Sequence, residues 1–173
     1  QVAGVAIDVG STTMSAHLCD MVTGDVLAST GAMNPQIRFG EDLMSRVSYG
    51  IMNPGGHLEM TSAVIEGLQK LISGAAEQAG LAADDVVEIV LVGNPVMHHL
   101  LLGIDPVELG GAPFALAVDT SIEVRASEIG LDVNKGARVY ILPCIAGHVG
   151  ADAAGVVLAE APQKGEINTL VVD

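Results

Sequence analysis

An aspartate within a short apolar strand, followed closely by a glycine and three hydroxyl side chains, is the clearest chemical signal in the sequence. Residues 5–13 read Val-Ala-Ile-Asp-Val-Gly-Ser-Thr-Thr. A glycine lets the backbone approach an anion closely, N–H groups and hydroxyls donate to phosphate oxygens, and a carboxylate holds a hydrated cation. An ordinary hairpin turn is the simpler interpretation. The pattern predicts a nucleotide-phosphate site with magnesium, formed by Asp8, Gly10, Ser11, Thr12 and Thr13.

Two later segments are predicted to complete this site. Residues 169–173 repeat the apolar strand that ends in an aspartate, so Asp8 and Asp173 are the predicted pair that holds Mg²⁺ through water. A glycine-rich turn at 146–150 precedes an alanine-rich segment. Gly147 and Gly150 are predicted to let the following helix approach the phosphates, although ordinary turn glycines would look the same.

Histidines supply no metal site by their spacing. His98 and His99 are adjacent on a predicted helix, about 100° apart around its axis, so a hydrogen bond to a core carbonyl is favoured over a shared metal. His148 lies near the predicted phosphate turn and can face nucleotide or solvent. No side chain is a clear base for positioning the attacking water, so the catalytic residue stays unassigned and slow hydrolysis is expected.

Charged residues gather between positions 38 and 46. Arg38, Glu41, Asp42 and Arg46 recur at spacings of three and four. Such spacing is typical of salt bridges on a solvated helix face. Contact with a partner is the alternative interpretation of these charges.

Composition narrows the class of protein. The 173 residues suit one domain, and with 50% hydrophobic but only 2% aromatic residues the core must consist of aliphatic side chains and methionine. A net charge of −14 leaves no basic footprint for nucleic acid. Cys19 and Cys144 are too far apart and too few for an iron–sulfur cluster or structural zinc, so buried free thiols are predicted.

Hydropathy argues against a membrane protein. No apolar run approaches the roughly 18 residues of a membrane span. The first residues also lack the basic region of a signal peptide. A cytoplasmic location is therefore expected.

The pattern of apolar residues predicts an α/β fold. Strands are expected at residues 5–8, 14–20, 26–30, 86–92, 121–126, 139–142 and 169–173, and helices at 39–51, 58–79, 96–102 and 151–160. Apart from the strand at 121–126, residues 106–137 are predicted to be mostly loop. Alternating strands and helices imply a mixed sheet with helices on both faces.

The beginning of the chain resembles the ribonuclease-H-like lobe of the actin, hexokinase and chaperone ATPase (ASKHA) superfamily. Strand, phosphate turn, strand, turn, strand is how that lobe begins. Three further segments resemble the reductive activators of corrinoid-dependent methyltransferases. They are Asn-Pro-Gln-Ile-Arg-Phe-Gly-Glu-Asp-Leu-Met-Ser-Arg at 34–46, Val-Gly-Asn-Pro-Val-Met-His-His at 92–99 with Gly-Ile-Asp-Pro at 103–106, and Leu-Pro-Cys-Ile-Ala-Gly-His-Val-Gly-Ala-Asp at 142–152.

The resemblance implies a function and an organisation. Such activators use ATP and Mg²⁺ to return an oxidised Co(II) corrinoid to Co(I), with an electron from an iron–sulfur domain outside this chain. The expected partner is a corrinoid protein or a corrinoid-dependent methyltransferase, and a homodimer stays open. Residues 1–173 resemble one actin-like lobe, the first half of the ATPase domain, with 169–173 beginning the second lobe. This segment alone is expected to be inactive.

Three alternatives remain at this point. One is an activator of the 2-hydroxyacyl-CoA dehydratase type, which shares the Asp-Val-Gly-Ser-Thr-Thr start but holds a cluster with its own cysteines. A small-molecule kinase of the same superfamily is the second, and it would need an acid near the lobe junction as base. The third is a non-catalytic actin-like lobe that serves only as a docking surface.

Overall fold

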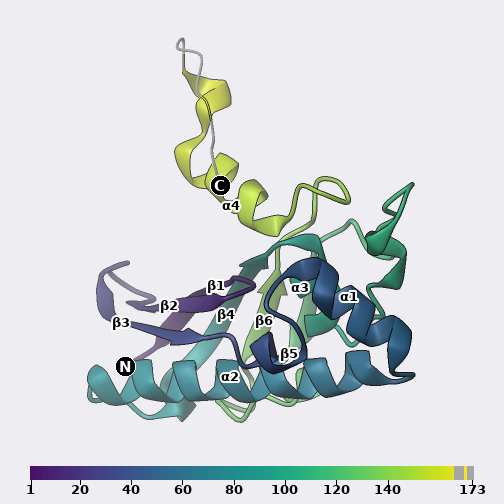
Figure 1. The fold of residues 1–173 in the computed structure, drawn as a ribbon. Coiled ribbons are helices and arrows are strands. Elements are labelled where there is room, and N and C mark those ends of the chain that lie inside the picture. Colours follow the sequence, from purple (N-terminus) through teal and green to yellow (C-terminus); the bar gives the residue numbers. More distant parts are fainter. Residues whose placement is uncertain (166–169, 171–173) are drawn as a thin grey trace.

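A six-stranded mixed sheet organises the chain in the computed structural model, which describes residues 1–165 and 170 (Figure 1). The strand order is β3-β2-β1-β4-β6-β5. The first three strands pair antiparallel, β1 pairs parallel with β4, β4 pairs parallel with β6, and β5 is antiparallel to β6. The strands are β1 (Ala3–Val9), β2 (Thr13–Asp20), β3 (Val26–Met33), β4 (Val86–Gly93), β5 (Ile122–Arg125) and β6 (Arg138–Ile141).

Among the described residues, four α-helices accompany the sheet, and Figure 1 shows the long helix α2 along one face and α4 on the opposite side. The helices are α1 (Leu43–Met52), α2 (Gly56–Gln78), α3 (Pro95–Leu101) and α4 (Ala151–Glu160). Short 3₁₀ turns lie at Pro35–Phe39, Ala83–Asp85, Val107–Gly110, Ala126–Ile129 and Pro162–Lys164. The predicted elements within the described residues are therefore all present. The strand predicted at 169–173 falls outside them except for Leu170.

One predicted helix was wrong in its extent. The segment 39–51 was predicted as a single helix, but a 3₁₀ turn ends at Phe39 and α1 begins only at Leu43. The physical reason is the Asp42 side chain, which accepts the Ser45 backbone N–H at 2.7 Å and so caps the helix there. The predicted loop at 106–137 likewise contains 3₁₀ turns.

The main core lies between α2 and one face of the sheet. Along β1, Val5, Ile7 and Val9 are buried whereas Ala6 and Asp8 are exposed, as the two-residue period of a strand requires. α2 adds an apolar stripe at helical spacing, made of Met60, Val64, Leu68, Leu71, Ile72 and Ala75. Burying each such leucine or isoleucine contributes about 1.5–3 kcal/mol.

Two glycines within α2 have different surroundings. A Cβ at Gly67 would lie 2.7 Å from Met14 Cε and 3.0 Å from Pro35 Cδ, so this glycine permits close contact between α2, β2 and the turn after β3. A Cβ at Gly74 would meet no atom within 4 Å. Of these two glycines, only Gly67 therefore permits close packing.

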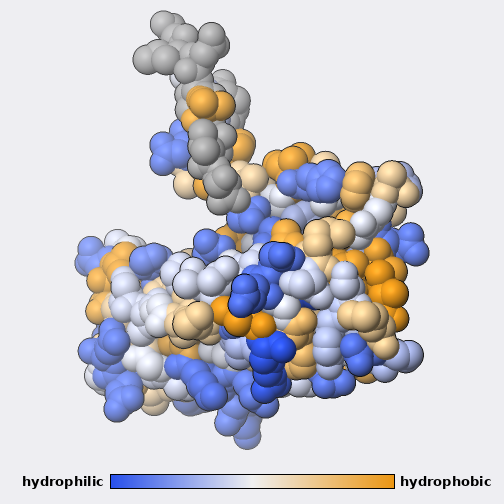
Figure 2. Space-filling model, viewed as in Figure 1, coloured by the Kyte–Doolittle hydropathy of each residue, from blue (hydrophilic) through white to orange (hydrophobic). Residues whose placement is uncertain are grey.

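The opposite face of the sheet is covered at one end. Gly155 of α4 packs over β4, with an added Cβ 3.3 Å from Val92 Cγ1, while Leu142 and Ala151 are buried beside it. Helices thus lie on both faces, as predicted, with unequal coverage. Beyond this contact α4 exposes Leu158, and Figure 2 shows the end of the described chain standing clear of the rest of the molecule.

Candidate functional site

Three turns meet at one edge of the sheet because β1, β4 and β6 run parallel and end there. The turn after β1 contains Gly10 and Ser11, the turn after β4 contains Asn94, and the segment after β6 leads through Gly150 into α4. A cavity of about 500 Å³ lies between them. Its lining consists of Asp8, Gly10, Ser11, Leu43, Asn94, His148, Val149, Gly150, Asp152 and Ala153.

Four of the site residues predicted from sequence line this cavity together. Asp8, Gly10 and Ser11 come from β1 and its turn, and Gly150 comes from the far end of the chain, immediately before α4. The fold therefore joins two segments that the sequence separates by about 140 positions. Both segments could be predicted from sequence because in each a glycine follows an apolar segment predicted to be a strand.

Of the other predicted residues, Thr12, Thr13 and Gly147 do not line the cavity. Thr12 and Thr13 are exposed at the start of β2. Gly147 packs against Phe114, whose carbonyl oxygen would collide with any Cβ placed there. Asp173 lies outside the described residues, so its predicted role in holding Mg²⁺ stays a prediction.

Glycine is required at Gly10 and Gly150 by the closeness of backbone atoms. A Cβ at Gly10 would collide with the Thr13 carbonyl oxygen. A Cβ at Gly150 would lie 2.6 Å from Asn94 Cα and 2.7 Å from Gly93 O. The turns that surround the cavity can approach one another only because these positions have no side chain.

Asn94 connects two of the turns. Its Oδ1 accepts the Met97 backbone N–H at 3.0 Å and so caps α3, while its Nδ2 donates to Ser11 Oγ at 3.0 Å. Asn94 belongs to a segment that carries the family resemblance, but no role in the site was predicted for it. The available signal was an asparagine followed by proline directly after a buried strand, which marks a capped turn at a strand end.

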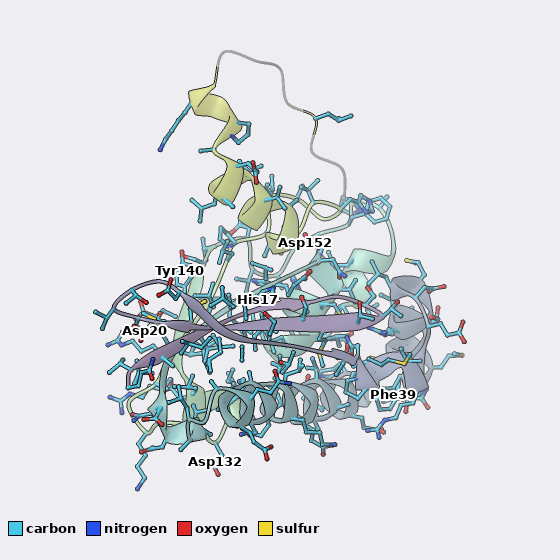
Figure 3. All side chains as sticks on the ribbon, turned by 90° about the vertical axis from the view of Figure 1, so that its left-hand side faces the viewer. His17, Asp20, Phe39, Asp132, Tyr140 and Asp152 are labelled. Atoms are coloured by element: carbon cyan, nitrogen blue, oxygen red, sulfur yellow. The ribbon has the colours of Figure 1, made fainter. Side chains whose placement is uncertain are left out.

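Two carboxylates, Asp8 and Asp152, face this cavity. Asp152 is in the first turn of α4, and Figure 3 shows it at the base of that helix. Within the described residues, no three His, Cys, Asp or Glu side chains gather in a metal cluster. Mg²⁺ commonly takes one or two carboxylates and completes its shell with waters and phosphate oxygens. The donor set therefore fits a magnesium ion that arrives with a phosphate ligand.

Comparison with known proteins shows which family the chain belongs to. Residues 3–164 match the family described as the RACo middle region. The chain belongs to that family. Corrinoid activation enzyme RamQ from Eubacterium limosum is 32% identical over 155 residues, which are 90% of this chain and 26% of that protein.

A solved structure of a corrinoid activator is also similar to this chain. The reductive activator for corrinoid,iron-sulfur protein matches with a TM-score of 0.92 and 34% identity, over 96% of this chain and 26% of the other. The chain thus spans about a quarter of the length of these relatives. The predicted fold class, an actin-like ATPase lobe with a mixed sheet, is confirmed.

The histidines of this RACo middle region differ in their surroundings. His99 is buried, with Nδ1 2.8 Å from the Pro95 carbonyl and Nε2 accepting the Ala117 N–H at 2.9 Å, which confirms the predicted core hydrogen bond. His98 is buried beside the Leu142 backbone, and burial lowers its pKa to about 4. His148 is exposed at the cavity, where its ring stacks on Phe114 with centroids 4.2 Å apart.

The two cysteines are free in this region. Cys144 is buried, and burial raises the pKa of its thiol to about 11, as expected for an inert core cysteine. Cys19 is only half-buried at the exposed end of β2, so the prediction of full burial was wrong for it. The odd-numbered residues of β2 lie on the uncovered sheet face, which explains its exposure.

Arg46 was predicted to be on a solvated helix face, and that prediction was wrong. Its side chain is fully buried in the first turn of α1, beneath the turn that follows β1. The burial of Arg46 could not be predicted, because its spacing of four residues from Asp42 is also that of an exposed salt bridge. No helix among the described residues has the length and apolarity that crossing a membrane would require.

Proposed function

We propose that this chain is the nucleotide-binding lobe of an ATP-dependent activator that returns a Co(II) corrinoid protein to Co(I). The observation that carries the proposal is the cavity where Asp8, the Gly10–Ser11 turn and Gly150 meet, in a chain of the RACo middle region family. Two relatives whose names describe corrinoid activation support the partner class.

The proposed nucleotide places its phosphates against the turn after β1. Ser11 is held by Asn94 and offers its backbone N–H, while Gly10 leaves room for close approach. Asp8 and Asp152 hold Mg²⁺ through water, which neutralises phosphate charge. His148 at the mouth of the cavity contacts the nucleotide from the α4 side.

The described part of the lobe offers few candidates for a catalytic base. Among the described residues that line the cavity, the side chains able to accept a proton are Asp8, His148 and Asp152. Slow hydrolysis follows, which suits a switch whose nucleotide changes the affinity for a partner. In the intact activator, an iron–sulfur centre outside this chain would supply the one electron that converts Co(II) to Co(I).

The test uses the full-length protein with a Co(II) corrinoid protein and a low-potential reductant. Co(I) formation is followed by its absorption spectrum, with and without Mg-ATP. We expect Mg-ATP to increase the rate, and equal rates would overturn the proposal. Omitting the activator controls for direct reduction of the corrinoid protein by the reductant.

Two alternatives predict different results in related measurements. A docking lobe without nucleotide binding would show no heat with Mg-ATP in calorimetry. An activator of the dehydratase type would hold a cluster with its own cysteines, yet Cys144 is buried with a raised pKa. The properties of Cys144 therefore argue against that alternative.

A further inference from the structure

A buried cation lies directly beneath the predicted phosphate turn. Arg46 is completely buried, and it forms no ion pair of 4 Å or less within the described part of the chain. Asp42 is the acid whose field acts on it, but that carboxylate accepts the Ser45 N–H and caps α1. The charge of Arg46 is therefore not cancelled by a contacting carboxylate.

All the hydrogen-bond acceptors of Arg46 are neutral. Nε donates to Gly40 O at 3.0 Å, Nη1 donates to Gln36 Oε1 at 3.2 Å and to Met97 Sδ at 3.1 Å, and Nη2 donates to Ser11 O. Burial lowers the pKa of Arg46 to about 10, so it stays protonated at neutral pH. A buried charge costs free energy unless something compensates it.

Arg46, Gln36 and Asn34 form a buried polar layer beneath the phosphate turn. Arg46 and Asn34 of this layer hold the carbonyls of the turn on one side. Gly10 O accepts from Asn34 Nδ2 at 2.8 Å, Ser11 O accepts from Arg46, and Thr12 O accepts the Asn34 N–H at 2.7 Å. In a trans peptide the carbonyl and the next N–H point in opposite directions. The N–H groups of Ser11 and Thr12 therefore point away from this layer.

We propose that Arg46 is the positioning residue of the phosphate site, acting through the Ser11 peptide and through its uncancelled charge. It fixes the carbonyl side of the turn inward, so that the opposite N–H groups are presented to phosphate oxygens. The buried charge of Arg46 also favours an anion on the far side of the turn. Such an anion compensates the free-energy cost of burying the Arg46 charge. The inference rests on the proposed nucleotide binding, and Arg46 itself touches no ligand.

The test compares two substitutions that separate charge from hydrogen bonding. In the full-length protein, Arg46→Lys keeps the cation, whereas Arg46→Gln keeps a hydrogen-bond donor without charge. Calorimetry measures Mg-ATP affinity, with thermal unfolding as the measure of stability. We expect Arg46→Gln to bind about tenfold more weakly than Arg46→Lys, a difference larger than their difference in stability explains.

Gln36→Met is the matched control, because it removes a fully buried polar neighbour from the same layer and leaves the cation in place. It should bind Mg-ATP within about threefold of wild type. Equal affinities of the lysine and glutamine variants, or an equal loss in Gln36→Met, would overturn the positioning role. A wild-type protein that does not bind Mg-ATP would instead refute the proposed function itself.

Discussion

Asp8 is at an exposed position of β1 and lines the cavity, where we propose that its carboxylate helps to hold a hydrated Mg²⁺. Asp8→Asn keeps the size of the side chain but removes its charge. We expect this variant to fold normally and to lose at least about tenfold in Mg-ATP affinity, measured by calorimetry on the full-length protein.

Asp25→Asn serves as the control, since Asp25 is an exposed acid in the turn before β3 and its loss changes the net charge equally. The control should bind like wild type. Equal affinities for the two variants would show that Asp8 is not part of the magnesium site.

Gly150 makes a second prediction at the residue scale. In Gly150→Ala the new Cβ would meet backbone atoms of Gly93 and Asn94, which cannot move as a flexible side chain can. We expect a loss of about 1–3 kcal/mol in the free energy of unfolding, measured with urea, together with weaker nucleotide binding. Gly111→Ala, where the Cβ meets open space, should change stability by less than about 0.5 kcal/mol.

Site residues could be predicted where neighbouring residues in the sequence form a recognisable motif. Asp8, Gly10 and Ser11 form one contiguous pattern, and Gly150 lies in a turn that glycines mark. The position of Asp152 at the cavity and the burial of Arg46 beneath the turn were not predicted, because both arise only from tertiary contact. An arginine four residues after an aspartate looks identical in sequence whether it faces solvent or lies beneath a turn.

Elements were predicted better than their boundaries. The two-residue period of β1 and the stripe along α2 each reflect a single buried face, so the sequence alone identifies them. The start of α1 depends on a capping contact between Asp42 and Ser45, which apolar periodicity does not register. Helical residues before that cap were therefore predicted where a 3₁₀ turn and a break occur.

The two glycines of α2 give a prediction at the element scale. Gly74→Ala should stabilise the protein by about 0.5–1 kcal/mol, because alanine has the higher helix propensity and space is open. Gly67→Ala should destabilise it by about 1 kcal/mol or more, because the Pro35 ring cannot move away. Urea unfolding of both variants measures the contrast, and changes of the same sign would contradict it.

The dependence of stability on pH is a property of the whole molecule, because it depends on how many protons the folded and unfolded states bind. The pKa of His98 is about 4 in the folded protein and that of His99 is also lowered, both chiefly by burial. Below pH 6.5 the unfolded chain therefore binds more protons than the folded state does. The free energy of unfolding falls as the pH is lowered from there to about pH 4. His98 alone should remove about 2 kcal/mol between pH 7 and pH 5.

Urea unfolding of wild type and His98→Leu at these two pH values measures this effect. The variant should lose less stability on acidification than wild type, whatever its stability at pH 7. Ser15→Ala, at an exposed position of β2, removes no titratable group and should keep the wild-type slope. A His98→Leu slope equal to that of wild type would contradict the expected contribution.

The bond between Asn94 and Ser11 joins residues 83 positions apart, and Gly150 is more distant still. The cavity therefore requires the non-local pairing of β1 with β4 and of β4 with β6, and a chain in which these strands are unpaired does not contain it. Any molecule that occupies it binds the finished fold alone and stabilises that fold by mass action, by about 2.7 kcal/mol at a hundredfold excess over Kd. Occupancy at this one edge should consequently slow amide hydrogen exchange even in strands that the ligand never touches.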